Sequence, residues 1–463
     1  MRFVDSRLVR QLKHLVPTHV VRFAREFRNA GFECFLVGGA VRDMVLNSKP
    51  VDFDFATNAV PDKTARLFHR VIPTGVKHGT VTVLYDRMSF EVTTYRTEGN
   101  YSNSRHPDSV AFVSSIEDDL SRRDFTMNAI AYDPVDGRLL DPYNGVADIR
   151  IATIRAIGEP RQRFQEDALR MLRVARFAAQ LSFTVDPATI EAARVQAHRI
   201  NLVSAERIRD ELTKLLQSPV PSTGLRLILD MRMLEHILPE LAEGIGVQQR
   251  DRHLFDVFEH SLRTCDAIAA DRLDLRLAAL LHDIGKPRSL EIQGDGDRTF
   301  HGHDKTSAEM ADSILARLRF PNDVRKHVTT LVRHHMFDYT PESTDASVRR
   351  LLRRVGPENI DDLIALRQAD RIAVRGDRDA GAAWASEMHQ RIDTIANRDD
   401  ALSVGDLTVN GDDLCAVGIP AGPRMGVVLD FLLESVLDDP TLNTRERLLE
   451  IAERYYRTRV DPH

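Results

Sequence analysis

The chain has 463 residues, of which 43% are hydrophobic and 29% charged, which supplies ample material for buried cores and excludes a mainly disordered protein. Its 63 Lys and Arg against 69 Asp and Glu give a net charge of −6, which excludes a uniformly basic nucleic-acid-binding surface but not a local basic groove. The three widely spaced cysteines favour neither a disulfide framework nor a thiolate zinc site, and no stretch approaches the roughly 18 apolar residues needed to cross a membrane. We therefore expect a soluble, cytoplasmic protein without a membrane partner.

Local patterns divide the chain into a strand-rich first part and a helical remainder. Short apolar or alternating runs, typical of strands, occupy residues 32 to about 140. Helical periodicity dominates from about residue 160 onward, with Pro and Gly at the expected helix boundaries. We predict four parts, namely an α/β head (1–150), a helical neck and body (151–248), a histidine-rich domain (249–375) and a helical C-terminal segment (376–463).

The first of these predicted strands ends in a glycine pair that opens a helix. Gly38 and Gly39 follow the apolar run and precede Arg42 in the first helical turn. Glycines let the backbone approach a phosphate closely, and a helix N-terminus favours an anion. Arg42 opposes the helix dipole there, which makes sense if a triphosphate lies opposite.

Acidic side chains follow on two later strands. In the run Val-Asp-Phe-Asp-Phe, strand alternation places Asp52 and Asp54 on one face and the phenylalanines on the other. Glu91 alternates in the same way with apolar neighbours in the strand 89–95. Neighbouring carboxylates repel each other unless a cation lies between them, and Mg²⁺ prefers such oxygen ligands. The pattern indicates two-metal phosphoryl transfer. The alternative interpretation is a solvated strand edge whose charges prevent aggregation.

Further motifs follow in a fixed order. They are Arg122-Arg123-Asp124 with Asn128 shortly after, and then Glu166-Asp167-Ala168-Leu169-Arg170. Together with the glycine pair and the acids, they resemble the bacterial class II tRNA nucleotidyltransferases, the CCA-adding enzymes and their poly(A) polymerase relatives, over about residues 20–240. The alternative for the Arg122 segment is an amphipathic stretch whose arginines are solvated.

The resemblance implies a fold and a set of site residues. The head would have the DNA-polymerase-β-type nucleotidyltransferase fold, and the catalytic metal ligands would be Asp52, Asp54 and Glu91. The nucleotide-binding residues would be Gly38, Gly39, Arg42, Arg122, Arg123, Asp124, Asn128, Asp167, Arg170, Arg173 and Arg176. Arg173 and Arg176 supply local basicity that suits a triphosphate or an RNA backbone.

One pair of these residues has the chemistry to choose a base. If residues 166–181 form one helix, Asp167 and Arg170 lie three apart and are neighbours. A carboxylate only accepts hydrogen bonds and a guanidinium only donates them, so the pair satisfies cytosine or adenine and leaves uracil or guanine unpaired. An ordinary surface ion pair is the alternative, but the family resemblance implies base reading, with Glu166 orienting Arg170.

A polar loop at residues 96–107 helps to choose within the family. It contains glycine and no run of apolar residues, which is typical of a mobile segment. It resembles the flexible loop that CCA-adding members use when they switch from C to A. The loop therefore favours complete CCA addition over A-only addition or poly(A) synthesis.

A second constellation lies in the histidine-rich domain. An apolar helix ends in His282-Asp283 before a glycine, with His260 upstream and Asp370 downstream. Residues 250–375 resemble the HD superfamily of metal-dependent phosphohydrolases, which implies that these four residues bind one metal. Further candidates for a second ion or for phosphate binding are His303, His334 and His335. Such mixed ligands suit Ni²⁺, Mn²⁺, Co²⁺, Fe²⁺ or Zn²⁺, and a single buried His could instead be a core residue.

The predicted function is template-independent addition or repair of the 3′-terminal CCA of tRNA, with CTP, ATP and Mg²⁺. The HD-like domain would add metal-dependent hydrolysis or serve as a body that docks RNA. The alternatives are an A-adding enzyme or poly(A) polymerase, an HD phosphohydrolase whose head only binds nucleotide, and a non-catalytic RNA-binding scaffold. The sequence leaves the oligomeric state open.

Overall fold

The computed structural model describes residues 6–98, 110–249, 254–294, 298–340, 342–375, 379, 381–396, 398 and 400–460. The chain divides into two compact units, Met1–Pro239 and Glu240–His463, each of which is described here by itself. Most of the polar loop predicted at residues 96–107 lies outside the described residues, namely residues 99–107.

A seven-stranded mixed sheet forms the centre of the head. Its strands have the order β3-β4-β5-β2-β1-β8-β9, and only the β2–β5 pairing is parallel. This pairing joins segments more than 30 residues apart in the chain, and it brings the first acidic strand beside the second. The strands are β1 (Cys34–Val37), β2 (Asp54–Thr57), β3 (Val71–Gly75), β4 (Thr80–Tyr85), β5 (Met88–Thr94), β8 (Ala131–Asp133) and β9 (Arg138–Leu140).

Aromatic packing on one face of the sheet fixes which way the acids point. Phe55 and Phe90 are buried and contact the ring of Phe23 in α2 (Thr18–Asn29), with centroid distances of 4.8 and 4.6 Å. Because successive strand side chains point to opposite faces, Asp54 and Glu91 emerge on the other face. The predicted alternation is therefore present in both strands.

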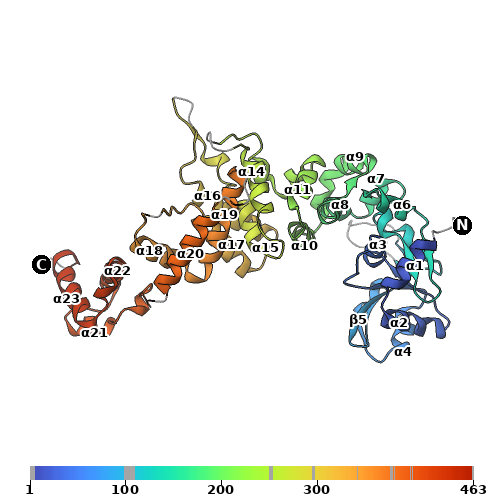
Figure 1. The fold of residues 1–463 in the computed structure, drawn as a ribbon, viewed down its shortest axis with the longest axis horizontal. Coiled ribbons are helices and arrows are strands. Elements are labelled where there is room, and N and C mark those ends of the chain that lie inside the picture. The colour runs from blue at the N-terminus through green and yellow to red at the C-terminus, as the bar shows by residue number, and fades with distance from the viewer. Residues whose placement is uncertain are drawn as a thin grey trace. The chain divides into compact units, whose positions relative to one another are not determined.

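The rest of the first unit is mostly helical. Helix α8 packs against α10 and α11 in the neck (Figure 1). Besides α2, the α-helices of the unit are α1 (Ser6–Leu15), α3 (Gly39–Val45), α4 (Pro61–Leu67), α5 (Ile116–Ser121), α6 (Gly145–Arg150), α7 (Pro160–Glu166), α8 (Leu169–Leu181), α9 (Pro187–Gln196), α10 (Ala205–Leu216), α11 (Pro221–Asp230) and α12 (Leu234–Ile237). Short strand pairs are β6 (Arg96–Glu98) with β7 (Val110–Phe112), and β10 (Thr153–Ile154) with β11 (Thr184–Val185).

The second unit is helical apart from one short strand pair. Helices α14, α15, α17 and α19 pack together around the predicted histidine and aspartate site. The elements are α13 (Pro239–Ala242), α14 (Val257–Asp266), α15 (Leu273–Leu281), β12 (Glu291–Ile292), β13 (Arg298–Thr299), α16 (His303–Arg317), α17 (Asn322–His334), α18 (Asp345–Val355), α19 (Ile360–Arg375), α20 (Ala382–Ala396), α21 (Gly411–Ala416), α22 (Pro423–Asp438) and α23 (Arg445–Tyr455).

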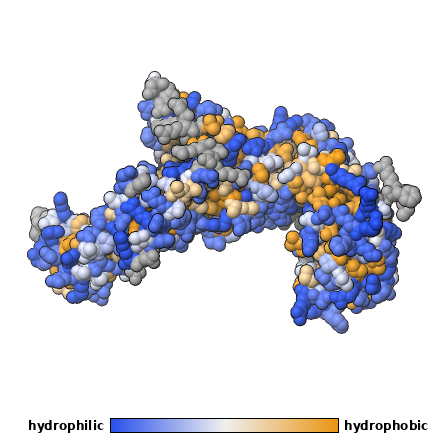
Figure 2. Space-filling model, viewed as in Figure 1, coloured by the Kyte–Doolittle hydropathy of each residue, from blue (hydrophilic) through white to orange (hydrophobic). Residues whose placement is uncertain are grey.

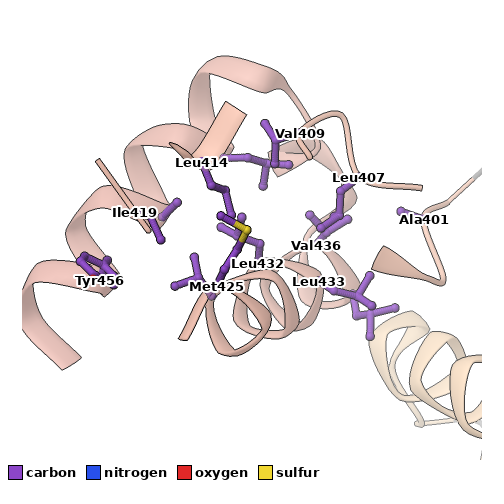
Figure 3. Close-up of a cluster of buried hydrophobic side chains, with 14 residues drawn as sticks. Ala401, Leu407, Val409, Leu414, Ile419, Met425, Leu432, Leu433, Val436 and Tyr456 are labelled. Carbon is purple, nitrogen blue, oxygen red and sulfur yellow. The ribbon is translucent and has the colours of Figure 1, made fainter. Parts of the chain in front are cut away.

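The C-terminal helices have a hydrophobic core of their own. Leu414, Leu432 and Met425 point toward one another among the buried side chains in Figure 3. Buried Arg349 of α18 donates hydrogen bonds to the carbonyl of Leu437 at 2.7 Å and to Asp400 at 2.9 Å. These bonds attach the C-terminal core to α18 (Asp345–Val355).

Hydrophilic residues prevail on the face of the C-terminal helices drawn in Figure 2. Among the described residues, no helix is long and apolar enough to cross a membrane.

Candidate active site and metal centre

The three predicted metal ligands lie near one another at the interior strands β2 and β5 of the head sheet. Asp54 and Glu91 face each other across the parallel β2–β5 pair, at a strand spacing of about 4.8 Å. Asp52 lies two residues before Asp54, in a bend that precedes β2, and not inside a strand as predicted. A bend there leaves its side chain exposed beside the first residue of β2.

The electrostatics of Asp54 indicate that a cation fits this site. Desolvation, followed by repulsion from Glu91 and Asp52, raises the pKa of Asp54 to about 6, even though Arg123 lowers it. The two neighbouring carboxylates thus raise the free energy of the charged form of Asp54. A divalent ion among these carboxylates would relieve the repulsion and would supply charge neutralisation for phosphoryl transfer.

This repulsion gives a direct prediction for the metal-free protein. Glu91→Gln removes the larger neighbouring negative charge, so the pKa of Asp54 is expected to fall below about 6 while staying above its ordinary value of 3.8 because the desolvation remains. Arg123→Gln is expected to raise it. Carboxyl-carbon NMR titration, with Asp54→Asn to assign the signal, measures both shifts. An unchanged pKa in Glu91→Gln would show that the two groups do not interact.

The predicted glycine turn follows Val37, the residue of β1 that pairs with Asp54. Gly38 has a φ of +67°, which favours glycine, and a Cβ there would lie 3.2 Å from Arg123 Nη1. Gly39 begins α3, and Arg42 in this helix donates to Asn128 Oδ1 at 3.0 Å. The turn therefore lies between two guanidinium groups, an arrangement that suits a triphosphate.

Buried aspartates position the arginines of the head. Asp119 is fully buried and accepts hydrogen bonds from Arg122 at 2.7 Å and from Arg123 at 3.2 Å. Desolvation alone would raise the pKa of Asp119, but these two arginines lower it. Sequence reasoning missed Asp119, even though it lies three residues before the predicted arginine pair.

A second buried aspartate connects the head to the neck. Asp124 accepts from Arg173 Nη2 at 2.5 Å and from Asn128 at 3.1 Å. Desolvation opposes ionisation, but Arg173 and Asn128 lower the pKa of Asp124 to about 2. Arg176 lies 2.8 Å from buried Glu211, and desolvation together with repulsion from Arg173 lowers its pKa to about 10. The predicted residues of α8 therefore form one charged network with those of the head.

The predicted base-reading pair has a different geometry from the expected one. Helix α7 ends at Glu166 and α8 begins at Leu169, so Asp167 lies in extended backbone between two helices. Its Oδ1 accepts the backbone N–H of Leu169 at 3.0 Å, a turn that aspartate favours over a helix interior. The prediction of one continuous helix over residues 166–181 is therefore wrong, although the backbone N–H of Arg170 still donates to the carbonyl of Asp167 at 3.1 Å.

Each member of the pair is instead held by another residue. Arg170 donates to Glu166 at 2.6 Å, as predicted, and also to the carbonyls of Arg163 and Arg122. Asp167 accepts from Arg207 of α10 at 2.7 Å. Sequence reasoning missed Arg207, although its place in the first turn of a helix is the same signal that singled out Arg42.

In the second unit, the four predicted HD ligands come together. His260 Nε2 lies 3.1 Å from Asp370 Oδ1 and 3.5 Å from Asp283 Oδ2, and His282 Nε2 lies 3.1 Å from the same Asp283 oxygen. His260, His282 and Asp283 are all buried. Desolvation alone would raise the pKa of Asp283, but His282 and Lys286 hold this pKa well below its ordinary value.

A second set of ligands shares the same aspartate. Asp283 Oδ1 lies 3.4 Å from His303 Nε2 and 3.5 Å from His335 Nε2. His334, a further candidate, instead lines a separate surface groove with Arg333 and Thr330. Two groups of three ligand atoms, each within 4.8 Å of one another, therefore meet at Asp283.

The orientation of the imidazoles indicates that cations fit both sets. The Nδ1 atoms of His282, His303 and His335 each lie within 2.8 Å of a backbone carbonyl, which makes Nδ1 the donor to that carbonyl and turns Nε2 toward the other ligand atoms. His303 Nε2 and His335 Nε2 lie 3.3 Å apart, and Asp283 Oδ1 is buried without a hydrogen bond. Imidazole nitrogens and a carboxylate oxygen that converge in a buried space are a ligand set that would suit a metal ion.

Comparison with known proteins identifies the family. The family profile described as poly A polymerase head domain matches residues 34–155, that of a probable RNA and SrmB-binding site of polymerase A matches 182–245, and that of the HD domain matches 250–375. A CCA-adding enzyme of Lactobacillus johnsonii is 33% identical over 94% of this chain and 96% of its own length. This chain belongs to the tRNA nucleotidyltransferase family.

Two further proteins that are similar to this nucleotidyltransferase are named for different specificities. An A-adding tRNA nucleotidyltransferase of Deinococcus radiodurans is 36% identical over 86% of this chain and 90% of its own length. The crystal structure of the Bacillus stearothermophilus CCA-adding enzyme in complex with CTP is 30% identical, with a TM-score of 0.73, and the match covers 96% of this chain and 98% of that one.

These comparisons confirm the predicted family, the α/β head followed by helical parts, and the nucleotidyltransferase activity. The nucleotidyltransferase and HD domains make the enzyme dependent on divalent metal ions. The four-part division and the roles of individual residues stay predictions.

Proposed function

We propose that this enzyme adds or repairs the 3′-terminal CCA of tRNA from CTP and ATP in the cytoplasm. The observation that carries the proposal is the convergence of Asp52, Asp54 and Glu91 beside a glycine turn flanked by arginines. These acids would hold Mg²⁺, which activates the RNA 3′-hydroxyl and neutralises the leaving pyrophosphate. The arginines hold the triphosphate, so positioning and charge neutralisation accomplish most of the catalysis.

Hydrogen-bonding capacity at the neck supports selection of C and A. Arg170 uses three of its five N–H groups on Glu166 and the two carbonyls, which leaves two donors for a base. Each oxygen of Asp167 accepts one hydrogen bond and has capacity for another. Together they would accept from the exocyclic amine of cytosine or adenine and donate to its ring nitrogen. Uracil and guanine place a carbonyl against the carboxylate, which such sites reject by factors of roughly 10⁴.

Complete CCA addition, A-only addition and poly(A) synthesis are separated by one assay. The CCA-adding relatives and the CTP complex support the first, whereas the A-adding relative of comparable identity makes the second a specific alternative. Transcribed tRNAs that end before the CCA, or after its second C, are incubated with CTP alone, ATP alone and both. We expect CTP alone to add two C residues, both nucleotides to complete the triplet, and synthesis to stop there. Extension of only the CC-ended tRNA would identify an A-adding enzyme, and a long A tail a poly(A) polymerase.

We further propose that the HD domain binds two metal ions and hydrolyses phosphoesters. Asp283 would contact both ions, with His260, His282 and Asp370 completing one ligand set and His303 with His335 the other. Imidazole and carboxylate ligands favour Mn²⁺, Ni²⁺, Co²⁺ or Zn²⁺. A metal bound there would activate water, and a 2′,3′-cyclic phosphate at a damaged RNA end is the substrate class that accords with the proposed partner. The neck, this domain and the C-terminal segment would also support the acceptor arm.

A further inference from the structure

The aromatic ring of Phe177 in α8 is the meeting point of three arginines from two helices. The guanidinium carbon of Arg176 lies 4.0 Å from the ring centroid, that of Arg42 5.3 Å and that of Arg173 5.4 Å. All three distances fall within the roughly 6 Å over which the face of an aromatic ring attracts a cation. Phe177 is buried and packs at nearly a right angle against Phe125, with a centroid distance of 5.8 Å. The ring is therefore held in place while it contacts the cations.

Helix spacing explains only one of these contacts. Arg173 comes four residues before Phe177 and faces it along α8. Arg176 is the immediate neighbour of Phe177, and immediate neighbours along a helix point in different directions, so its side chain folds back over the ring. Arg42 reaches the ring from α3 in the head. Phe177 thus gathers charges that local structure does not bring together.

Bringing these positive charges together costs free energy. Desolvation, followed by repulsion from Arg173, lowers the pKa of Arg176 to about 10, and Arg42 acts in the same direction, although nearby carboxylates oppose the shift. The arginines also have different acidic partners. Arg42 donates to Asp43 at 2.7 Å, whereas Arg173 donates to Asp124 at 2.5 Å. The aromatic ring is the contact that all three guanidinium groups share.

We propose that Phe177 is a positioning residue that holds these three arginines together as one cationic site for the triphosphate of the incoming nucleotide. The inference rests on the proposed function, because it assumes that the arginine cluster binds the triphosphate. A ligand with several negative charges then meets donors that are already gathered, and fewer side chains have to be ordered when it binds. Because CTP and ATP share the triphosphate, Phe177 sets the affinity for both and leaves the choice of base to Asp167 and Arg170.

The test weakens the electron-rich face of the ring and keeps its shape. Phe177 is replaced by phenylalanines that carry one, two and then three ring fluorines, each of which reduces the attraction for a cation. KM for CTP and for ATP is expected to rise together in steps, by about tenfold at three fluorines, the weight of one well-desolvated cation–π contact. The inhibition constant of inorganic tripolyphosphate, which has no base, should rise by the same factor.

Two further readouts distinguish this role from a general loss of structure. The value of kcat at saturating nucleotide and the CTP-to-UTP ratio of kcat/KM should stay at those of the wild type, because the change affects binding of a group that all nucleotides share. Phe164 provides the matched control. It is fully buried in α7 of the same unit, and no guanidinium lies over its ring in the part of the chain that the structure describes. Three fluorines on Phe164 should leave KM unchanged.

The failure of this inference can be told apart from a failure of the proposed triphosphate site. An unchanged KM with three fluorines on Phe177, or a rise for CTP without a rise for ATP and tripolyphosphate, overturns the inference. Arg42→Gln removes one guanidinium directly, so it should raise KM and the tripolyphosphate constant whatever the role of the ring. Unchanged values in Arg42→Gln would contradict the proposed triphosphate site itself.

Discussion

Asp54→Asn is expected to reduce incorporation of both C and A by about a thousandfold or more, because an uncharged amide no longer holds the metal that the reacting phosphate requires. The substitution keeps the shape of the side chain and removes a carboxyl whose pKa is raised by its neighbours, so the fold should be no less stable. Incorporation of labelled CTP and ATP into tRNA measures the loss. Binding of tRNA, measured separately, should change little.

Asp62→Asn is the matched control for this variant. Asp62 is exposed in the first turn of α4, in the same domain, and takes no part in the acidic cluster. Its activity should equal that of the wild type. If Asp54→Asn kept activity within about tenfold of wild type, the acid would not be a metal ligand in the reaction, since such ligands contribute several kcal/mol to transition-state stabilisation.

Asp283→Asn is expected to remove metal from the second unit. Asp283 is the one carboxylate common to both ligand sets, and a neutral amide cannot offset the charge of two ions. After dialysis against Mn²⁺ or Ni²⁺, elemental analysis should find two ions bound to that unit in the wild type and a large loss in the variant. Hydrolysis of 2′,3′-cyclic nucleotides should be lost in parallel.

The two substitutions should act independently of each other. Asp283→Asn should leave nucleotide incorporation unchanged, and Asp54→Asn should leave the metal content of the HD domain unchanged. Asp323→Asn, an exposed acid in the first turn of α17, is the control. Metal retained by Asp283→Asn at the wild-type level would contradict the proposed ligand sets. Metal binding without hydrolysis in the wild type would contradict the proposed HD activity alone.

The sequence by itself determined the features that depend on local spacing. Asp54 alternates with Phe55, and Glu91 alternates with Phe90. This was enough to predict that both acids point away from the face that buries the phenylalanines, because strand periodicity is a property of the backbone. The apolar helix that ends at His282-Asp283 and the glycine turn at Gly38 were predictable for the same reason. Ordered motifs then identified the family.

Only the tertiary structure decided which distant residues meet. The parallel pairing of β2 with β5 places Asp54 beside Glu91, and packing of α10 against α8 brings Arg207 to Asp167. The helix break at Asp167 was missed because its cause, a side-chain hydrogen bond to Leu169, competes with an otherwise regular helical pattern. Periodicity reports the face on which a side chain lies. The partner on that face depends on how elements far apart in the chain pack together, and no local pattern encodes that choice.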